Sequence, residues 1–424
     1  MTSLSLLFWI LLGISLQLAI FLGISFGRHW QNYLALKANI TGSAPPAPLA
    51  SHPEGVPGQG SWTDYRPFLV SRKVIEDAAG SICSFYLEPE DGQPLPRFRP
   101  GQFLTFRLEI PDGAGGVEPL VRCYSLSDAP RPDHYRVSIK RISASAGADR
   151  PPGRVSNHFH DQVQEGSLLL ARAPAGHFYL DSGEDPVVLI AGGIGITPLL
   201  SMLNWGLTQQ PGREIWLFYG VRNSHEAIMT EHLRALADTH PQFKLRLCFS
   251  NPLATDQVGR DFHHAGRVDI TCLRLELNLK PYHFFLCGPT PLLETLVPAL
   301  EEWGVPPARI HFEAFGPASI PRRQPAPSPE PVAKGLASAP EILVTYARSG
   351  QQLTWRPDAG SLLDLAEAHD IAIPSGCRAG GCGTCQTRIA SGEVSYRQPP
   401  DYDPEPGTCL LCVCTPKTAV TLEA

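Results

Sequence analysis

Three cysteines lie close together near the C-terminal end of the chain, in the segment Cys377-Arg-Ala-Gly-Gly-Cys382-Gly-Thr-Cys385. Their spacing, C-x4-C-x2-C, is typical of a plant-type [2Fe-2S] cluster loop. Such a loop holds iron with thiolates, and its glycines let the backbone fold tightly enough to turn N–H groups toward the cluster. A structural zinc site is the alternative, but it favours two C-x2-4-C pairs, and this segment has one such pair with a third cysteine offset from it. The spacing therefore predicts a domain that carries electrons.

The fourth ligand must come from Cys409, Cys412 or Cys414, in the segment TCLLCVCTP. Here residues 341–424 resemble the plant-type ferredoxin family, in which the last ligand follows an apolar pair and is followed four residues later by a proline. The resemblance implies that Cys412 is the ligand. Its separation from Cys385 is shorter than is usual in the family, so Cys414, and after it Cys409, remain alternatives. The predicted elements suit a β-grasp domain: strands at 341–346 and 352–355 and a helix at 362–368.

Cysteine content, length and charge narrow the class of protein further. Eleven cysteines in 424 residues could indicate disulfides, but they are unevenly spread, and those of the predicted cluster loop must stay reduced to bind iron. The working domains are therefore expected to face a reducing compartment. The length allows two to four domains, and a formal charge of −6 gives no electrostatic footprint for nucleic acid.

The N-terminal segment differs in composition from the rest of the chain. No charged residue occurs from Leu4 to Phe26, a stretch long enough to cross the hydrocarbon core as a helix. We therefore predict a single-pass membrane anchor at residues 1–27, because a cleaved signal peptide has a shorter apolar run preceded by basic residues. Arg28 and Lys37 follow the run and no basic residue precedes it, which predicts that the catalytic domains are cytoplasmic.

Two further segments lack hydrophobic periodicity and are predicted to be linkers. Residues 28–62 contain APPAP and GVPGQG and are expected to form a flexible spacer. Residues 321–340 are rich in Pro and Ala and are expected to tether the ferredoxin-like domain. Residues 63–182 and 183–320 lie between the linkers as two more domains. The predicted fold class is thus multidomain: a transmembrane helix, an antiparallel β-barrel, a Rossmann-like α/β domain and a β-grasp domain.

Residues 63–182 contain short alternating segments separated by turn residues, which predicts a small antiparallel barrel. The segment Arg122-Cys-Tyr124-Ser125 resembles a flavin motif of the ferredoxin-NADP reductase superfamily. The resemblance implies that Arg122 binds the flavin pyrophosphate, that Tyr124 packs on the isoalloxazine ring, and that the Ser125 hydroxyl lies near flavin N5. A diphosphate does suit a bidentate guanidinium, and a flat ring suits an aromatic face.

A second segment, G-R-V-S at 153–156, resembles the other flavin motif of the superfamily. It begins a predicted helix whose free N–H groups can hold a phosphate. Family members that use FMN lack this adenylate half, so the resemblance implies FAD. Together with the strand V-S-I-K at 137–140, it gives the remaining candidate flavin-binding residues: Ile139, Lys140, Gly153, Val155 and Ser156.

From residue 183 the pattern changes to buried strands that end in glycine-rich or polar turns. A strand at 187–191 runs into G-G-I-G-I-T-P and then an apolar helix at 199–207, a unit typical of nucleotide binding. The loop alone is weak evidence, because it departs from the fingerprint G-x-G-x-x-G. Three more segments are predicted at strand ends, where open α/β sheets bind ligands: F-Y-G-V-R at 218–222, L-C-G-P-T at 286–290 and E-A-F-G at 313–316.

These segments also resemble the pyridine-nucleotide half of the same superfamily. The resemblance implies that Cys287 lies near the nicotinamide and that Phe315 borders the flavin, so that both join Tyr124 and Ser125 as candidate catalytic residues. For Cys287 a buried core thiol is the alternative, and that alternative fits the other isolated cysteines better still. The candidate nucleotide-binding residues are Gly193, Gly195, Thr197, Gly288 and Pro289.

The combined prediction is an anchored reductase that passes electrons from NAD(P)H through FAD and the [2Fe-2S] cluster to a protein acceptor such as an oxygenase, desaturase or cytochrome. NADH is favoured, because only Arg222 follows the strand that ends near Gly220 and Glu226 comes soon after it. Two alternatives remain: a membrane-associated NADH:quinone reductase and a non-catalytic redox sensor.

Overall fold

The computed structural model describes residues 64–111, 115–143, 152–315, 341–376, 383–396 and 404–424, with single positions 17, 62, 378, 380, 400 and 402. The predicted membrane anchor, apart from Gln17, and the linker at 321–340 lie outside these residues, and the linker at 28–62 is described only at Trp62. None of the helices in the described ranges is long and apolar enough to cross a membrane. All elements below belong to the compact unit at residues 58–424.

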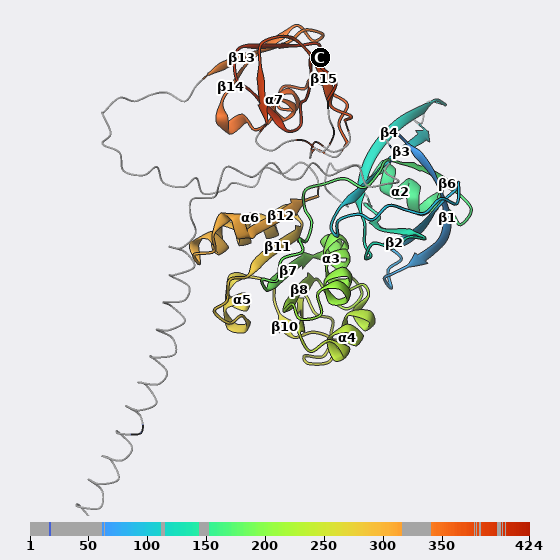
Figure 1. Ribbon diagram of the computed structural model, residues 1–424, viewed down its shortest axis with the longest axis vertical. Helices are drawn as coiled ribbons and strands as arrows, with labels where there is room; N and C mark the ends of the chain where they lie inside the picture. Colours follow the sequence, from blue (N-terminus) through green and yellow to red (C-terminus); the bar gives the residue numbers. More distant parts are fainter. Residues whose placement is uncertain are drawn as a thin grey trace, which may run out of the picture. The chain divides into compact units, whose positions relative to one another are not determined.

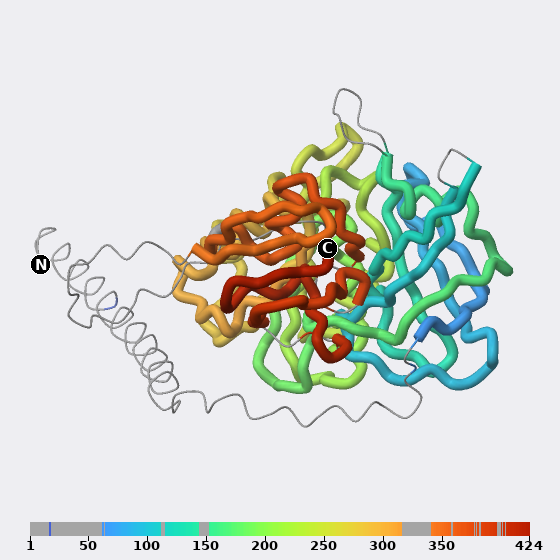
Figure 2. The backbone as a smooth tube through the Cα atoms, turned by 90° about the horizontal axis from the view of Figure 1, so that it is seen from above, coloured from blue at the N-terminus to red at the C-terminus, as the bar shows by residue number. Residues whose placement is uncertain are grey.

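The first domain is an antiparallel sheet of six strands in the order β4-β3-β6-β1-β2-β5, drawn in blue to green in Figure 2. An isolated bridge between Leu126, just after β4, and Val137 of β5 joins the two edges, so the predicted barrel is present. The sequence pattern does not predict β4, because its first three side chains are exposed, only Ser125 is buried, and Pro119 interrupts it. The strands are β1 (Arg66–Ile75), β2 (Ile82–Pro89), β3 (Phe103–Pro111), β4 (Val117–Ser125), β5 (Tyr135–Lys140) and β6 (Leu168–Ala171).

Helix α2 (Arg154–Asp161) packs on the barrel through Phe159, whose side chain is fully buried. The Phe159 ring makes edge-on contacts with Phe85 of β2 and Phe106 of β3, with ring centroids 5.3 and 5.5 Å apart. These aromatic contacts fix the helix that begins at the second flavin motif.

The second domain is a parallel sheet of six strands in the order β10-β9-β8-β7-β11-β12, with helices on both faces (Figure 1). The core residues of α3 and α4 pack on one face and those of α5 and α6 on the other, because alternate residues of β7 point to opposite faces. The elements are β7 (Val187–Gly192), α3 (Ile196–Gln209), β8 (Ile215–Val221), α4 (Thr230–Thr239), β9 (Phe243–Phe249), β10 (His264–Ala265), α5 (Ile270–Glu276), β11 (His283–Gly288), α6 (Thr290–Glu302) and β12 (Ile310–Ala314).

Strand β7 comes first in this sheet and lies between β8 and β11. The chain therefore winds outward from β7 in both directions, and the strand order reverses between β7 and β11. Open α/β sheets bind ligands at the carboxyl ends of the strands at such a reversal. Both predicted nucleotide loops, after β7 and after β11, lie at this place.

The third domain has a five-stranded sheet, β14-β13-β19-β15-β17, and a separate pair, β16-β18. Its helix α7 (Leu362–Glu367) starts with a capping box between Ser361 and Asp364 and buries its apolar face in the domain core, in agreement with the predicted β-grasp arrangement. The strands are β13 (Ile342–Tyr346), β14 (Gln351–Trp355), β15 (Gln386–Ser391), β16 (Val394–Tyr396), β17 (Thr408–Leu410), β18 (Cys414–Pro416) and β19 (Val420–Leu422).

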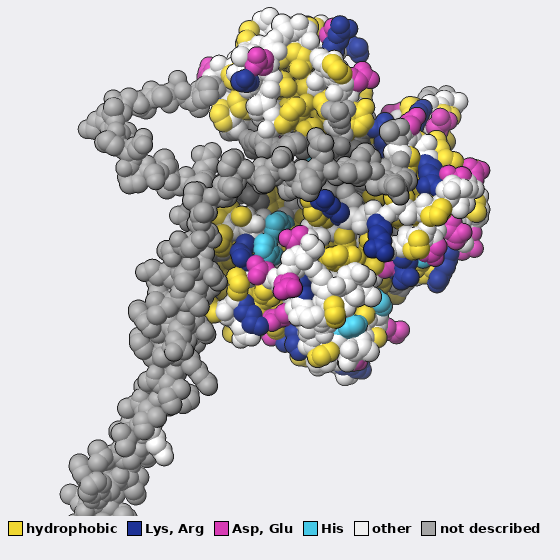
Figure 3. All heavy atoms as spheres, viewed as in Figure 1, with side chains coloured by type: hydrophobic (Ala, Val, Ile, Leu, Met, Phe, Trp, Pro, Cys, Tyr) yellow, Lys and Arg dark blue, Asp and Glu magenta, His cyan; other side chains and the backbone are white. Residues whose placement is uncertain are grey.

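Charged side chains of both signs lie next to one another on the face of the barrel and the α/β domain that Figure 3 shows. Ion pairs of the barrel include Arg66 with Asp91 and Arg141 with Asp161.

Candidate active site

Strand β4 presents Arg122 and Tyr124 on one face, because side chains alternate along a strand. The Arg122 side chain is exposed, and its Nη1 donates to the Val121 carbonyl at 2.7 Å. The Tyr124 ring packs edge-on against Phe159 with centroids 5.3 Å apart, and burial raises the pKa of its hydroxyl, which keeps it neutral at physiological pH. Arg122 thus lies two residues from a packed aromatic ring on the same face of the strand. This arrangement suits a ligand that has both a diphosphate and a flat ring.

The second flavin motif is tied to the end of β5. The Gly153 N–H donates to the Ile142 carbonyl at 2.9 Å, and the Ile142 N–H donates to Ser156 Oγ at 3.3 Å. No side chain of the described residues caps the N-terminus of α2, so its first N–H groups are available to an anion. The Val155 side chain belongs to the barrel core, which leaves its backbone as the part that can meet a ligand.

The two candidate residues on β5 have different surroundings. Ile139 is buried in the barrel core, and its carbonyl lies 2.9 Å from His160 Nε2, whereas Lys140 at the strand end is only half-buried. The same histidine has its Nδ1 3.5 Å from Cys83 Sγ. The sequence predicts that His160 decorates a helix and does not bind a metal, and the structure places it as a buried support between α2 and the barrel.

Ser125, the last residue of β4, meets the end of the parallel sheet. Its hydroxyl donates to Glu313 Oε2 of β12 at 3.5 Å, and its side chain is buried. Burial raises the pKa of Glu313 to about 8, although the hydrogen bond from Ser125 opposes this rise. This contact joins the predicted flavin residues to the nucleotide-binding sheet. Glu313 belongs to the terminal motif but is not among the predicted site residues, and its signal is an acidic residue near the end of a half-buried strand.

The loop after β7 depends on glycine at two positions. Gly193 has φ +53°, a left-handed conformation that favours glycine. A Cβ on Gly195 would lie 2.2 Å from the Cys287 carbonyl oxygen, so the loop packs directly on the end of β11. The Thr197 hydroxyl donates to the Ile194 carbonyl at 3.0 Å and closes the turn into α3. A rigid loop of this shape lets a ligand approach the backbone closely.

Cys287, Gly288 and Pro289 complete the same edge at the end of β11 and the start of α6. The Cys287 side chain is fully buried, and burial together with the nearby Glu313 charge raises its thiol pKa well above the ordinary value. The thiol is therefore neutral, and its side chain packs in the hydrophobic core of the α/β domain, as in the alternative of a buried core thiol. Phe315 follows β12 and is 41 % exposed, so its ring can cover a ligand at this edge.

Two of the four predicted cluster ligands, Cys377 and Cys382, lie outside the described residues. The other two are close together: Cys385 Sγ lies 3.1 Å from Cys412 Sγ. This separation is longer than a disulfide bond of about 2.0 Å, and two sulfurs this close together could share a metal site. Within the described residues no group of three or more possible metal ligands converges, as expected when half of the predicted set is outside them.

The alternative fourth ligands have a different environment. Cys409 and Cys414 are both fully buried in the domain core, whereas Cys412 is only half-buried. A hydrogen bond with the Cys409 thiol is the main cause that raises the pKa of Cys414, with burial second. The two side chains thus contact each other in the core, while Cys412 turns toward Cys385. The geometry fits a thiolate-bound cluster held through Cys412. None of the nine cysteines in the described ranges forms a disulfide.

Comparison with known proteins identifies two of the domains. Residues 189–297 match the oxidoreductase NAD-binding domain, and residues 344–417 match the 2Fe-2S iron-sulfur cluster binding domain. The flavohemoprotein of Halalkalibacterium halodurans is 38% identical over 260 residues, which cover 61% of this chain and 62% of the relative. The chain thus spans less than two thirds of the length of the curated relatives that it matches first.

Two solved structures also resemble this chain. The flavohem-like FAD/NAD-binding domain of nitric oxide dioxygenase from Vibrio cholerae O1 biovar El Tor is 31% identical, with a TM-score of 0.52, and the match covers 60% of this chain and all of that domain (100%). Phthalate dioxygenase reductase, described as a modular structure for electron transfer from pyridine nucleotides to [2Fe-2S], is 25% identical, with a TM-score of 0.50, over 85% of this chain and 98% of that one.

The chain therefore belongs to the oxidoreductases with a ferredoxin-NADP-reductase-like NAD-binding domain, and it carries a C-terminal 2Fe-2S domain. Its domains are those that bind FAD, NAD(H) and a [2Fe-2S] cluster, as predicted from the motifs.

Proposed function

We propose that the protein transfers electrons from NADH, through FAD and a [2Fe-2S] cluster, to a protein acceptor such as an oxygenase, desaturase or cytochrome. The observation that carries this proposal is the contact of Ser125 with Glu313, because it joins the flavin motif to the nucleotide edge of the sheet. The same chain also carries the close thiol pair Cys385 and Cys412.

Bound FAD would supply the chemistry that links hydride transfer from NADH to the single-electron chemistry of a [2Fe-2S] cluster. The chain's own residues bind and orient the reactants. Arg122 binds the flavin diphosphate, and Tyr124 fixes the plane of the ring. The loop at Gly195 places the nicotinamide, and Cys287 keeps water from that edge. Ser125 and Glu313 offer a route of two side chains by which a proton can leave or reach the reacting side of the flavin.

The two ends of this path can be tested with the purified full chain. One FAD and two iron atoms per chain are expected, and NADH should bleach the flavin absorbance under anaerobic conditions.

We expect NADH to exceed NADPH in kcat/KM by about tenfold or more, because the Arg222 guanidinium forms an ion pair with Glu226 instead of being free for a 2′-phosphate. FMN in the acid extract would contradict the adenylate assignment, and a higher kcat/KM with NADPH would reverse the preference.

We also propose that residues 1–27 hold the reductase at a membrane as a single span, with the catalytic domains in the cytoplasm. This proposal is supported by the uncharged run and by Arg28 and Lys37, which follow it. A chain that starts at Ser61 should reduce a one-electron dye as fast as the full chain, but it should transfer electrons more slowly to native membranes, since anchoring raises the effective concentration of the acceptor. Equal rates with membranes for both chains would indicate a soluble acceptor.

A further inference from the structure

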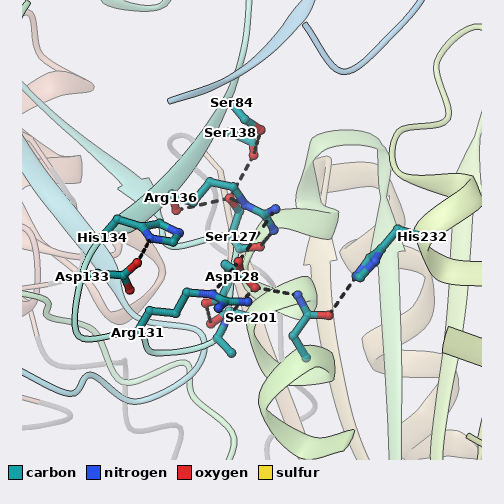
Figure 4. A network of polar contacts seen from close by, with 12 residues as sticks. Ser84, Ser127, Asp128, Arg131, Asp133, His134, Arg136, Ser138, Ser201 and His232 are labelled. Carbon is teal, nitrogen blue, oxygen red and sulfur yellow. Dashed lines mark hydrogen bonds and ion pairs between the residues drawn. The ribbon is translucent and has the colours of Figure 1, made fainter. Parts of the chain in front are cut away.

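A network of polar side chains joins the barrel to helix α3 of the α/β domain (Figure 4). Asp128 lies in the segment just after β4, and its Oδ1 accepts a hydrogen bond from Asn204 Nδ2 of α3 at 2.8 Å. The Asp128 backbone carbonyl accepts a second bond from Ser201 Oγ at 2.7 Å. Ser201 and Asn204 are one turn apart on the same helix face. A single barrel residue therefore holds that face of α3 at two points.

The barrel side of the network fixes the position of Asp128. Arg136 of β5 places Nη1 4.0 Å from Asp128 Oδ2, and its Nε donates to Ser127 Oγ at 3.1 Å. Ser127 Oγ lies 2.9 Å from Ser138 Oγ, deep in the barrel. Burial raises the pKa of Asp128, but the Arg136 charge and the Asn204 hydrogen bond outweigh burial and hold the pKa below its ordinary value. Asp128 is therefore a fixed carboxylate at neutral pH.

The α/β side of the network fixes the amide of Asn204. Its Oδ1 lies 3.2 Å from His232 Nε2 of α4, so the carbonyl end of the amide faces the histidine. The NH2 end then faces the Asp128 carboxylate, in agreement with the hydrogen bond from Asn204 Nδ2 to Asp128 Oδ1. The hydrogen bond between the two residues thus runs from the Asn204 amide to the Asp128 carboxylate.

The residues of this network are close in sequence to the predicted flavin and nucleotide sites. Asp128 follows Ser125 by three residues, and Ser201 follows Thr197 by four. Helix α3 begins at Ile196, directly after the turn Gly193–Gly195. The segments between these residues are short, and a helix is stiff along its axis. The place at which Asp128 meets α3 therefore sets how the nucleotide loop lies relative to the end of β4.

We propose that Asp128 is a positioning residue for hydride transfer, which sets the alignment of the nucleotide loop with the flavin-facing end of β4 through Asn204 and Ser201. The proposal rests on the proposed function, because it assumes that NADH reduces the flavin at this edge. A clamp with only a structural role would change stability and leave the reaction of the folded protein unchanged.

The test is anaerobic stopped-flow reduction of the full, cofactor-loaded protein by NADH, with the rate constant at saturating NADH separated from the apparent Kd. Asp128→Ala should lower that rate constant by roughly ten- to a hundredfold, because small misplacements of reactants have effects of this size. The long-wavelength absorbance of the NADH–flavin complex should weaken, while FAD and iron content stay unchanged. Asp128→Asn keeps an oxygen that can accept from Asn204 and should restore most of the rate.

Asn204→Ala removes the same hydrogen bond from the other side and should reproduce the loss, so it carries the test where Asp128→Ala does not fold. Gln209→Ala, an exposed position at the end of α3, is the matched control and should react as the wild type does. Unchanged rate constants in Asp128→Ala or Asn204→Ala would overturn the proposal, as would a rate loss that follows FAD loss in proportion. Failure of NADH to reduce the wild-type flavin would instead contradict the proposed function.

Discussion

Replacement of Cys412 by alanine is expected to remove bound iron and abolish electron transfer to a protein acceptor, whereas Cys414→Ala should retain both. The reason is the different placement of the two thiols: Cys412 Sγ lies 3.1 Å from Cys385 Sγ, while Cys414 contacts Cys409 in the domain core. Outer-shell partners of a metal are already worth about 10- to 100-fold in metal affinity, so the loss of a ligand should exceed that range.

This prediction is tested by measuring the iron content per chain, the visible spectrum of the cluster and the rate of cytochrome c reduction. Flavin reduction by NADH is the internal control, and it should stay near the wild-type rate in both variants because the cluster domain follows the flavin in the proposed electron path. Iron retained in Cys412→Ala but lost in Cys414→Ala would move the fourth ligand to Cys414. Loss of flavin reduction together with iron would contradict the proposed order of the centres.

Glu313→Gln is expected to lower steady-state electron transfer on the order of 10²-fold, the usual effect of losing a positioned proton-transfer group. The pKa of Glu313, raised to about 8 by burial, leaves the carboxyl protonated at pH 7 and ionised above pH 8. If the ionised form accepts the proton through Ser125, the wild-type rate should rise between pH 7 and pH 9. Glu313→Gln should lack this rise, and Glu302→Gln, at an exposed position on α6, should keep it.

The same pKa predicts a trend in stability. The unfolded carboxyl titrates near 4.5 and the folded one near 8, so between these values the native state binds a proton that the unfolded chain does not. This contribution to the free energy of unfolding is complete below pH 4.5 and is lost as the pH rises through 8. Denaturant unfolding at pH 6 and pH 9 should show a smaller decrease for Glu313→Gln than for the wild type. An equal decrease in both proteins would mean that Glu313 ionises near its ordinary pKa.

The sequence by itself determined the domains and the nature of their ligands. Alternation of apolar residues predicted most barrel strands, and the glycine-rich turn after a buried strand predicted the nucleotide loop at Gly193 and Gly195. Cysteine spacing predicted the iron–sulfur domain, which the family match confirms. These features are local, because burial, turn geometry and ligand spacing each leave a pattern within a few neighbouring residues.

The tertiary structure alone decided which distant side chains meet. Ser125 and Glu313 are 188 positions apart, and Asp128 and Asn204 are 76 apart. The strand order, with β7 between β8 and β11, brings together the loops that follow β7 and β11. No periodicity along the sequence indicates that order. The same reason applies to Cys412, whose proximity to Cys385 depends on where the turn after β17 leaves the core. A pattern along the sequence indicates that a residue is buried, but the packing of the sheets determines which residues its side chain contacts.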